Sequence, residues 1–373
     1  MSRITPRIIG QSLTLRFQSL SLALSPALPL SLSLALVFFL ALTGLNLASL
    51  AAARPALAAD RLVCASYPVW LFTRYLNEGR DLFRVELLTN PETGCPHEFA
   101  PTPKDLERLT QTKVLVKNGL DLEPYLDRAL KVAPPDVEVI DASQGVPTLA
   151  AGWGRIDFDG TMVQDSAGQS PAMRPNPHIF LSPKLSLTMM ANIAAALSRL
   201  DPSGADHYAS RLADWELETK SVIEDINRFR DTHRGYKLVT SHGFMDYLAQ
   251  DMGLAVIADI SPLGTEAAPS GQRLSRLAQL IGREKVAAIL VDPETNPGVA
   301  RVFSKDYKIP AAILDTATSG TFDPPIDFYV QVIRENIDLL NRLLPANVQP
   351  TPEPPKPVPV PNNPQPVQPP EFD

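Results

Sequence analysis

The chain has 373 residues, a formal net charge of −7 and a hydrophobic fraction of 45%. An acidic chain lacks the basic face that nucleic-acid binding requires, so we expect no nucleic-acid partner. Between two atypical ends, the remaining length suits two folded lobes rather than one domain.

The first 58 residues have the order of features of a secretory signal peptide. Arg3, Arg7 and Arg16 precede an apolar stretch, and Ala56-Leu57-Ala58 offers a small-x-small cleavage site. The alternative is an uncleaved membrane anchor, because the apolar span Leu28–Leu50 is long enough for a bilayer, which needs roughly 20 residues. We therefore expect a periplasmic or other extracytoplasmic protein, anchored to the membrane if the segment is retained.

Residues 59–201 alternate strand-like and helix-like segments, which predicts an N-terminal α/β lobe with a parallel sheet. The predicted strands are Leu62–Ser66, Phe83–Thr89, Lys113–Asn118 and Glu138–Asp141, and the predicted helices are Pro68–Asn77, Pro103–Thr110 and Ser186–Arg199. Residues 150–176 break this alternation, since they are rich in glycine, alanine and isolated charges. We interpret them as a surface flap.

One long helix is predicted over residues 202–233, because its apolar residues recur every three to four positions. Tyr208, Trp215 and Ile226 belong to this series. At 1.5 Å per residue such a helix is roughly 40 Å long, which suits a rigid connection between two lobes.

Residues 234–344 resume the alternation and predict a C-terminal α/β lobe. The predicted strands are Lys237–Thr240, Ala255–Ile260, Val286–Val291 and Ala311–Leu314, and the predicted helices are Gly243–Gln250, Ser270–Ile281, Pro297–Lys305 and Ile326–Leu344. The expected fold is therefore α/β, with two lobes of parallel sheet and flanking helices joined by one long helix. Residues 345–373 are rich in proline and predict a disordered tail or semi-rigid spacer, with contact to an unknown partner as the alternative.

Three of the five histidines share one setting, which is a short polar turn at the edge of an apolar stretch. They are His97, His178 and His242, and Asp315 also follows a strand-like run. Ligands of open α/β folds bind at the carboxyl ends of the strands, and imidazole is the commonest metal ligand in proteins. Three imidazoles and one carboxylate predict a tetrahedral site for a divalent metal, zinc first, in the cleft between the lobes.

The chain has two cysteines, Cys64 and Cys95. In an exported protein an even pair most simply predicts one disulfide, which would tether the His97 loop to the neighbouring strand. The alternative is that the two sulfur atoms act as thiolate ligands of the metal.

Four motifs follow one another in a specific order along the two lobes. They are PHEFAPTP at His97, NGLDLE, PHIFLSP at His178 and SHGFMDYL at His242. Together with ILDTATSGTF at Asp315, this combination resembles the periplasmic zinc- and manganese-binding proteins of ABC importers, of the zinc-uptake type. The matching segments cover almost the full folded length.

By that resemblance, His97, His178, His242 and Asp315 correspond to the four metal ligands of the family. Histidine at the third position favours zinc, because manganese-selective relatives carry glutamate there and nitrogen-rich sites suit zinc. The resemblance therefore implies Zn²⁺ as the transported ligand, with Mn²⁺ or Fe²⁺ as alternatives.

Other polar residues are candidates for orienting these ligands. Asn118 and Glu123 belong to the NGLDLE motif, and either hold a ligand in place or stabilise a buried turn. The family often has glutamate near the end of the strand Val286–Val291, where this chain has Asp292 and Glu294. The flap contains no histidine, so a second, metal-gathering site in it is not expected.

The resemblance implies a monomeric solute-binding protein that delivers the metal to an ABC-type membrane permease, and not an enzyme. In agreement, the chain has no HExxH motif. The alternatives are a metal-dependent adhesin or scaffold and a secreted zinc hydrolase, in which Asp315 would be a general base. Because imidazole must be neutral to bind, we expect affinity to fall as the pH drops toward about 6.5.

Overall fold

The computed structural model describes residues 59–92, 94, 96–152, 155, 174–261 and 269–346. The predicted signal segment, Cys95, most of the flap and the tail from residue 347 lie outside these ranges. Within the ranges, none of the helices combines the length and apolar character that a bilayer span requires.

The N-terminal half contains one four-stranded sheet in which every pair of neighbouring strands is parallel. Its strands are β1 (Asp60–Cys64), β2 (Phe83–Leu87), β3 (Val114–Lys117) and β4 (Glu138–Asp141), in the order β2-β1-β3-β4. The helical segments are α2 (Tyr67–Asn77), η1 (Pro96–Glu98), α3 (Pro103–Leu109), α4 (Leu126–Ala129), η2 (Leu130–Val132), η4 (His178–Leu181) and α5 (Pro183–Leu200).

Both faces of this sheet are covered, which explains the continuous apolar runs Leu62–Cys64 and Val114–Val116 in its two central strands. Side chains alternate between the two faces of a strand. Leu62 and Val116 therefore pack into the core that contains α2 and α5, whereas Val63 and Leu115 pack into a separate core with α3 and α4.

The C-terminal half repeats the same strand order in a second parallel sheet. Its strands are β5 (Lys237–Thr240), β6 (Ala255–Asp259), β7 (Ala288–Val291) and β8 (Ala311–Ile313), in the order β6-β5-β7-β8. The helical segments are η6 (Gly243–Met245), α7 (Asp246–Met252), α8 (Gly271–Glu284), α9 (Gly298–Tyr307) and α10 (Phe328–Leu343). The order reverses between β1 and β3 in one sheet and between β5 and β7 in the other, and such switch points are where open α/β sheets bind ligands.

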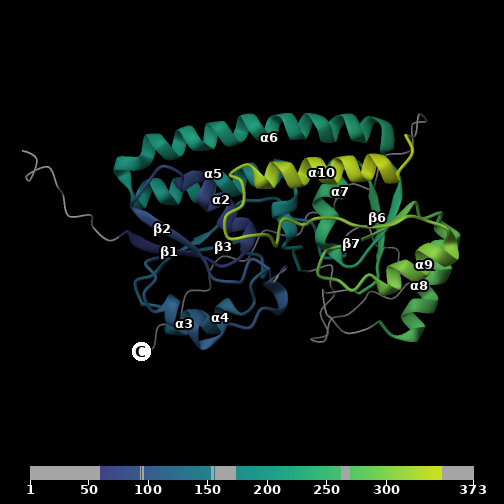
Figure 1. The fold of residues 1–373 in the computed structure, drawn as a ribbon, viewed down its shortest axis with the longest axis horizontal. Helices are drawn as coiled ribbons and strands as arrows, with labels where there is room; N and C mark the ends of the chain where they lie inside the picture. Colours follow the sequence, from purple (N-terminus) through teal and green to yellow (C-terminus); the bar gives the residue numbers. More distant parts are fainter. Residues whose placement is uncertain are drawn as a thin grey trace, which may run out of the picture. The chain divides into compact units, whose positions relative to one another are not determined.

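The long helix α6 (Ala205–His233) connects the two halves after a short turn, η5 (Pro202–Gly204). It has 29 residues and packs against α2 and α5 of the first half and against α7 and α10 of the second, with α10 running beside it (Figure 1). Trp215, near its middle, contacts the rings of Phe72 and Tyr75 on α2 and of Tyr329 on α10. One buried indole therefore joins helices from both halves.

A second connection runs from the C-terminal half back to α2. In the segment between β8 and α10, the Gly320 N–H donates to Pro91 O at 2.9 Å, and Thr321 O accepts a hydrogen bond from the Tyr67 hydroxyl at 2.9 Å. A Cβ atom on residue 320 would lie 2.3 Å from the Tyr67 hydroxyl oxygen, so the approach requires glycine.

The predicted alternation of strands and helices agrees with the structure in both halves, and so does the long helix between them. The short segments η1, α4, η2, η4 and η6 were not predicted as separate elements, since three or four residues show no periodic pattern. Two of the candidate ligands, His97 and His178, lie in these short segments, η1 and η4. No periodic pattern in the sequence marks these segments.

We predict that Trp215→Ala lowers the free energy of unfolding by about 3–5 kcal/mol, because it leaves a cavity among three aromatic rings. Leu217→Ala on the same helix is the matched control, since Leu217 is 71% exposed, and it should change this free energy by less than about 0.5 kcal/mol. Urea denaturation followed by circular dichroism measures both. Equal effects of the two substitutions would show that Trp215 does not join the two halves.

Candidate metal centre

The three candidate histidines lie at the ends of elements from both halves of the fold. His97 lies in η1, in the loop that follows β2, and His178 is the first residue of η4. His242 follows β5 and precedes η6 in an extended conformation. Because η4 packs against η6 as well as against α5, the second and third histidines are carried on turns that touch.

The structure brings these three imidazoles together. The Nε2 atoms of His97 and His178 lie 3.3 Å apart, and the two ring centroids are separated by 5.1 Å. The ring centroids of His178 and His242 are also 5.1 Å apart. Two nitrogen ligands at 2.0–2.1 Å from one tetrahedral zinc ion lie about 3.3 Å apart, which is the separation seen between His97 and His178.

The ligating atoms of the four predicted ligands do not surround a common point in the structure. Among the described residues, no group of three or more histidine, cysteine, aspartate or glutamate side chains could hold a metal ion as placed. The Nε2 atom of His242 is nevertheless buried without a hydrogen-bond partner among the described residues, and a buried polar atom of this kind needs one. Imidazole nitrogens are donors that zinc prefers, so the chemistry of this set fits a zinc ion.

His242 faces an acidic side chain with its other nitrogen. Its Nδ1 lies 3.4 Å from Asp292 Oδ1, which also accepts hydrogen bonds from the hydroxyls of Ser241 and Thr295. Asp292 follows β7 and His242 follows β5, and these neighbouring strands end at the switch point of the second sheet. Burial acts to raise the pKa of Asp292, but the hydrogen bond and charge of His242 outweigh burial and hold it well below its usual value.

Asp315 lies farther along the same sheet, after the edge strand β8, which β7 separates from β5. Its carboxylate accepts a hydrogen bond from the Ala317 N–H at 2.8 Å, and its backbone exchanges two hydrogen bonds with the Asn336 side chain. None of these contacts with described residues involves a histidine. The assignment of Asp315 as the fourth ligand remains a prediction.

The two candidates from the NGLDLE motif differ in their contacts. The Asn118 side chain donates to Pro177 O at 3.0 Å and thereby supports the turn that precedes His178. Glu123 is fully buried and accepts hydrogen bonds from the Ser66 hydroxyl and from the Asn118 N–H. Burial raises the pKa of Glu123 to about 7. Its carboxyl group organises the loop after β3, and its hydrogen bonds within the described residues reach no histidine.

Glu294 lies at the loop that carries the first histidine. A Cβ atom on Gly94 would fall 2.0 Å from Glu294 Cγ, so the glycine leaves room for this side chain three residues before His97. Glu294 also accepts a hydrogen bond from the Thr318 hydroxyl at 3.2 Å. Burial raises its pKa to about 7, and the neighbouring Asp292 acts in the same direction.

Two of the candidate ligands, His97 and His178, are neutral at neutral pH. Burial lowers the pKa of His97 to about 4, with a further contribution from His242, and burial lowers the pKa of His178 well below its usual value. Burial therefore moves proton competition at His97 to a lower pH than the reference value of about 6.5, because that value applies to a solvent-exposed ring.

Cys64 is fully buried at the end of β1 and forms no disulfide within the described residues. Burial raises its pKa to about 12, so this sulfur is protonated at neutral pH and is not in the form that binds metal. Its predicted partner Cys95 lies outside the described residues. The disulfide remains a prediction.

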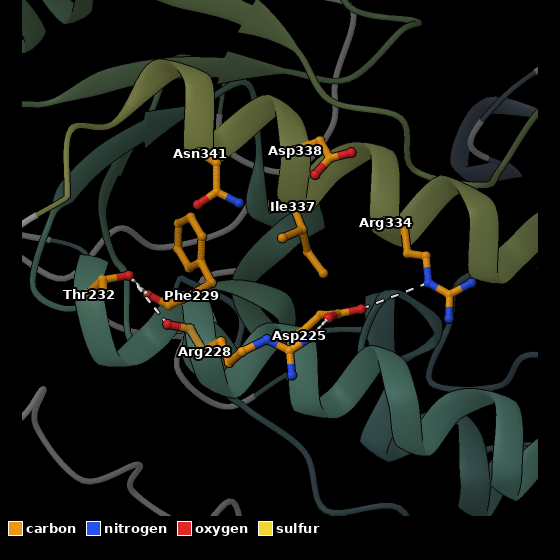
Figure 2. Close-up of a pocket in the computed structure, with 8 residues that line it drawn as sticks. All are labelled: Asp225, Arg228, Phe229, Thr232, Arg334, Ile337, Asp338 and Asn341. Carbon is orange, nitrogen blue, oxygen red and sulfur yellow. Dashed lines mark hydrogen bonds and ion pairs between the residues drawn. The ribbon is translucent and has the colours of Figure 1, made fainter.

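A groove of about 380 Å³ lies elsewhere, between α6 and α10 (Figure 2). It is lined by Asp225, Arg228, Phe229, Thr232, Arg334, Ile337, Asp338 and Asn341. Asp225 forms ion pairs with both arginines, at 3.8 Å in the case of Arg334 Nε. Because no histidine lines this groove, its chemistry differs from that of the candidate metal centre.

Comparisons with known proteins agree with this architecture. The zinc-binding protein AdcA of Streptococcus pyogenes serotype M6 is 26% identical over 292 residues, which cover 75% of this chain and 55% of AdcA. The high-affinity zinc uptake system protein ZnuA of Bacillus subtilis is 23% identical over 283 residues, covering 75% of this chain and 86% of that protein. The chain thus spans about half the length of the AdcA relatives that it matches.

A solved structure shows the same fold. The SBP FpvC from Pseudomonas aeruginosa in complex with Mn²⁺ superposes with a TM-score of 0.65 at 22% identity, covering 77% of this chain and 98% of FpvC. The family described as the periplasmic component A of the zinc-uptake complex matches residues 63–343. Since that match includes both sheets, the long helix and all three histidines, the chain belongs to this zinc-uptake family.

Proposed function

We propose that this protein captures Zn²⁺ between its two lobes outside the cytoplasm and delivers it to an ABC-type membrane permease. The observation that carries the proposal is the convergence of His97, His178 and His242, from both halves of the fold, with a nitrogen separation that suits tetrahedral zinc. The names of the relatives support zinc as the cargo, and family membership supports a permease as the partner.

In this proposal Asp292 orients His242 rather than binding the ion. A carboxylate on one imidazole nitrogen fixes the tautomer and leaves the other nitrogen for the metal. Asp292 lies at Nδ1, whereas Nε2 is buried and has no hydrogen-bond partner in the part of the chain that the structure describes. Asp315 is the proposed fourth ligand.

A closed set of ligands favours a binding protein over an enzyme, because a catalytic zinc ion keeps one coordination position open for water or substrate. Three imidazole donors also favour zinc over manganese, which prefers oxygen ligands. The proposed role is therefore reversible capture, with Mn²⁺ or Fe²⁺ as weaker cargo.

We predict that His242→Ala abolishes tight Zn²⁺ binding and that Asp315→Asn weakens it, because each removes a ligand. Asp292→Asn should weaken binding by about 10–100-fold, as expected for a residue that orients a ligand. Isothermal titration calorimetry with Zn²⁺ and with Mn²⁺ measures these effects on the metal-free protein.

The matched control is His207→Ala, which removes a histidine from α6 outside the site and should leave affinity unchanged. Manganese binding as tight as zinc binding, or indifference to His242→Ala, would contradict the proposed cargo and ligand set. If Asp315→Asn kept full affinity and Asp292→Asn lost it completely, Asp292 rather than Asp315 would be the fourth ligand.

We predict that Zn²⁺ affinity persists to about pH 5 and is lost as the pH approaches the His97 pKa of about 4. The stability of the metal-free fold should also decrease as the pH falls. An imidazole with a folded pKa below its unfolded value of about 6.5 stabilises the fold above that pH, and this stabilisation is lost between about pH 6.5 and 4. Calorimetric titrations across this range test the prediction, and a tenfold loss of affinity per pH unit beginning near pH 6.5 would contradict it.

A further inference from the structure

Asn176 lies in the middle of the contact between the turns that carry His178 and His242. It is 2% exposed, and its side-chain oxygen accepts the backbone N–H of His178 at 3.0 Å and lies 2.8 Å from His178 Nδ1. Its side-chain nitrogen donates to Gly243 O at 2.7 Å and to Asp246 Oδ2 at 3.0 Å. Each end of this one amide therefore holds a different turn.

These neighbours fix which end of the amide is the oxygen. A backbone N–H only donates, and a backbone carbonyl only accepts, so the atom facing His178 N must be oxygen and the atom facing Gly243 O must be nitrogen. The amide oxygen carries no proton, so the hydrogen bond to His178 Nδ1 requires a proton on that ring nitrogen. His178 Nε2, 3.3 Å from His97 Nε2, then carries the lone pair.

The same amide sets the spacing of the two turns. Gly243 directly follows His242, and a Cβ atom on Gly243 would lie 3.1 Å from the Asn176 side-chain nitrogen. Glycine therefore allows the close approach. The backbone of Asn176 is held as well, since its N–H donates to Leu149 O and its carbonyl accepts the Tyr247 hydroxyl at 2.7 Å.

A buried ion pair supports the donor end of the amide. Asp246 is fully buried and pairs with Arg155 at 2.8 Å, and Arg155 also pairs with Asp259 at 2.7 Å. A buried carboxylate requires a partner of opposite charge, which Arg155 provides. Asp246 is thereby held with its second oxygen on the Asn176 nitrogen.

We infer that Asn176 is a positioning residue, which fixes His178 as the Nδ1-protonated tautomer and holds its turn against that of His242 before metal arrives. The inference rests on the proposed function only in its consequence, which is that His178 Nε2 is ready to bind Zn²⁺. The tautomer itself is a property of the metal-free protein.

The test is a long-range proton–nitrogen correlation NMR spectrum of the metal-free, ¹⁵N-labelled full chain at neutral pH, with His178→Ala to assign the signals. We expect a protonated Nδ1 and an unprotonated Nε2 on His178. Asn176→Leu should release this tautomer and lower Zn²⁺ affinity by about 10–100-fold. Asn176→Asp keeps an acceptor at Nδ1 and should retain the tautomer, but it loses the donor to Gly243 O and sets two carboxylates against each other, so it should also lower Zn²⁺ affinity.

Asn192→Leu is the matched control, because Asn192 also donates two side-chain hydrogen bonds to backbone carbonyls, at Ala142 and Gln144. It should change neither the tautomer nor the affinity. A proton on His178 Nε2 in the wild type would overturn the inference even if Zn²⁺ binds tightly, and so would an unchanged tautomer in a folded Asn176→Leu protein. The expected tautomer without any Zn²⁺ binding would instead refute the proposed function and leave this inference standing.

Discussion

The packing of α6 is the constraint on which the rest of the structure depends. Each sheet presents its own histidines, so the two sheets must be held at a fixed separation for the imidazoles to meet. The buried stripe of α6 contacts helices from both halves, and Trp215 joins the rings of α2 and α10. Because protein interiors are close-packed, a shift of one half relative to the other would open a void along this stripe.

Burial then determines the chemistry of the histidines. Desolvation keeps His97 and His178 neutral, and each neutral ring retains a lone pair for a cation. The carboxylate of Asp292 faces the one imidazole that lies at the switch point of the second sheet. The result is a centre rich in nitrogen donors, in which the Asp292 carboxylate faces the Nδ1 atom of His242. Such a centre suits a borderline-soft divalent ion better than a hard one.

Much of this could be predicted from the sequence, because the apolar alternation and the period of the long helix are local signals. The three histidines could also be found, since each stands beside an apolar run. The partner of His242 could not be found in that way, because the order β6-β5-β7-β8 decides that Asp292 rather than Asp315 lies next to it, and strand order has no local signal. Asn176 was missed for a similar reason: its partners Gly243 and Asp246 lie about seventy residues away in the chain.

The segment between β8 and α10 makes a residue of one half depend on a residue of the other. Gly320 belongs to the second half of the chain and Tyr67 to the first, yet the tyrosine hydroxyl occupies the space that a larger residue at 320 would need. A chimaera that takes its two halves from different relatives must therefore match this pair as well as the surface of α6. Each half contains its own sheet, but one half cannot be replaced by that of a relative without regard to the other.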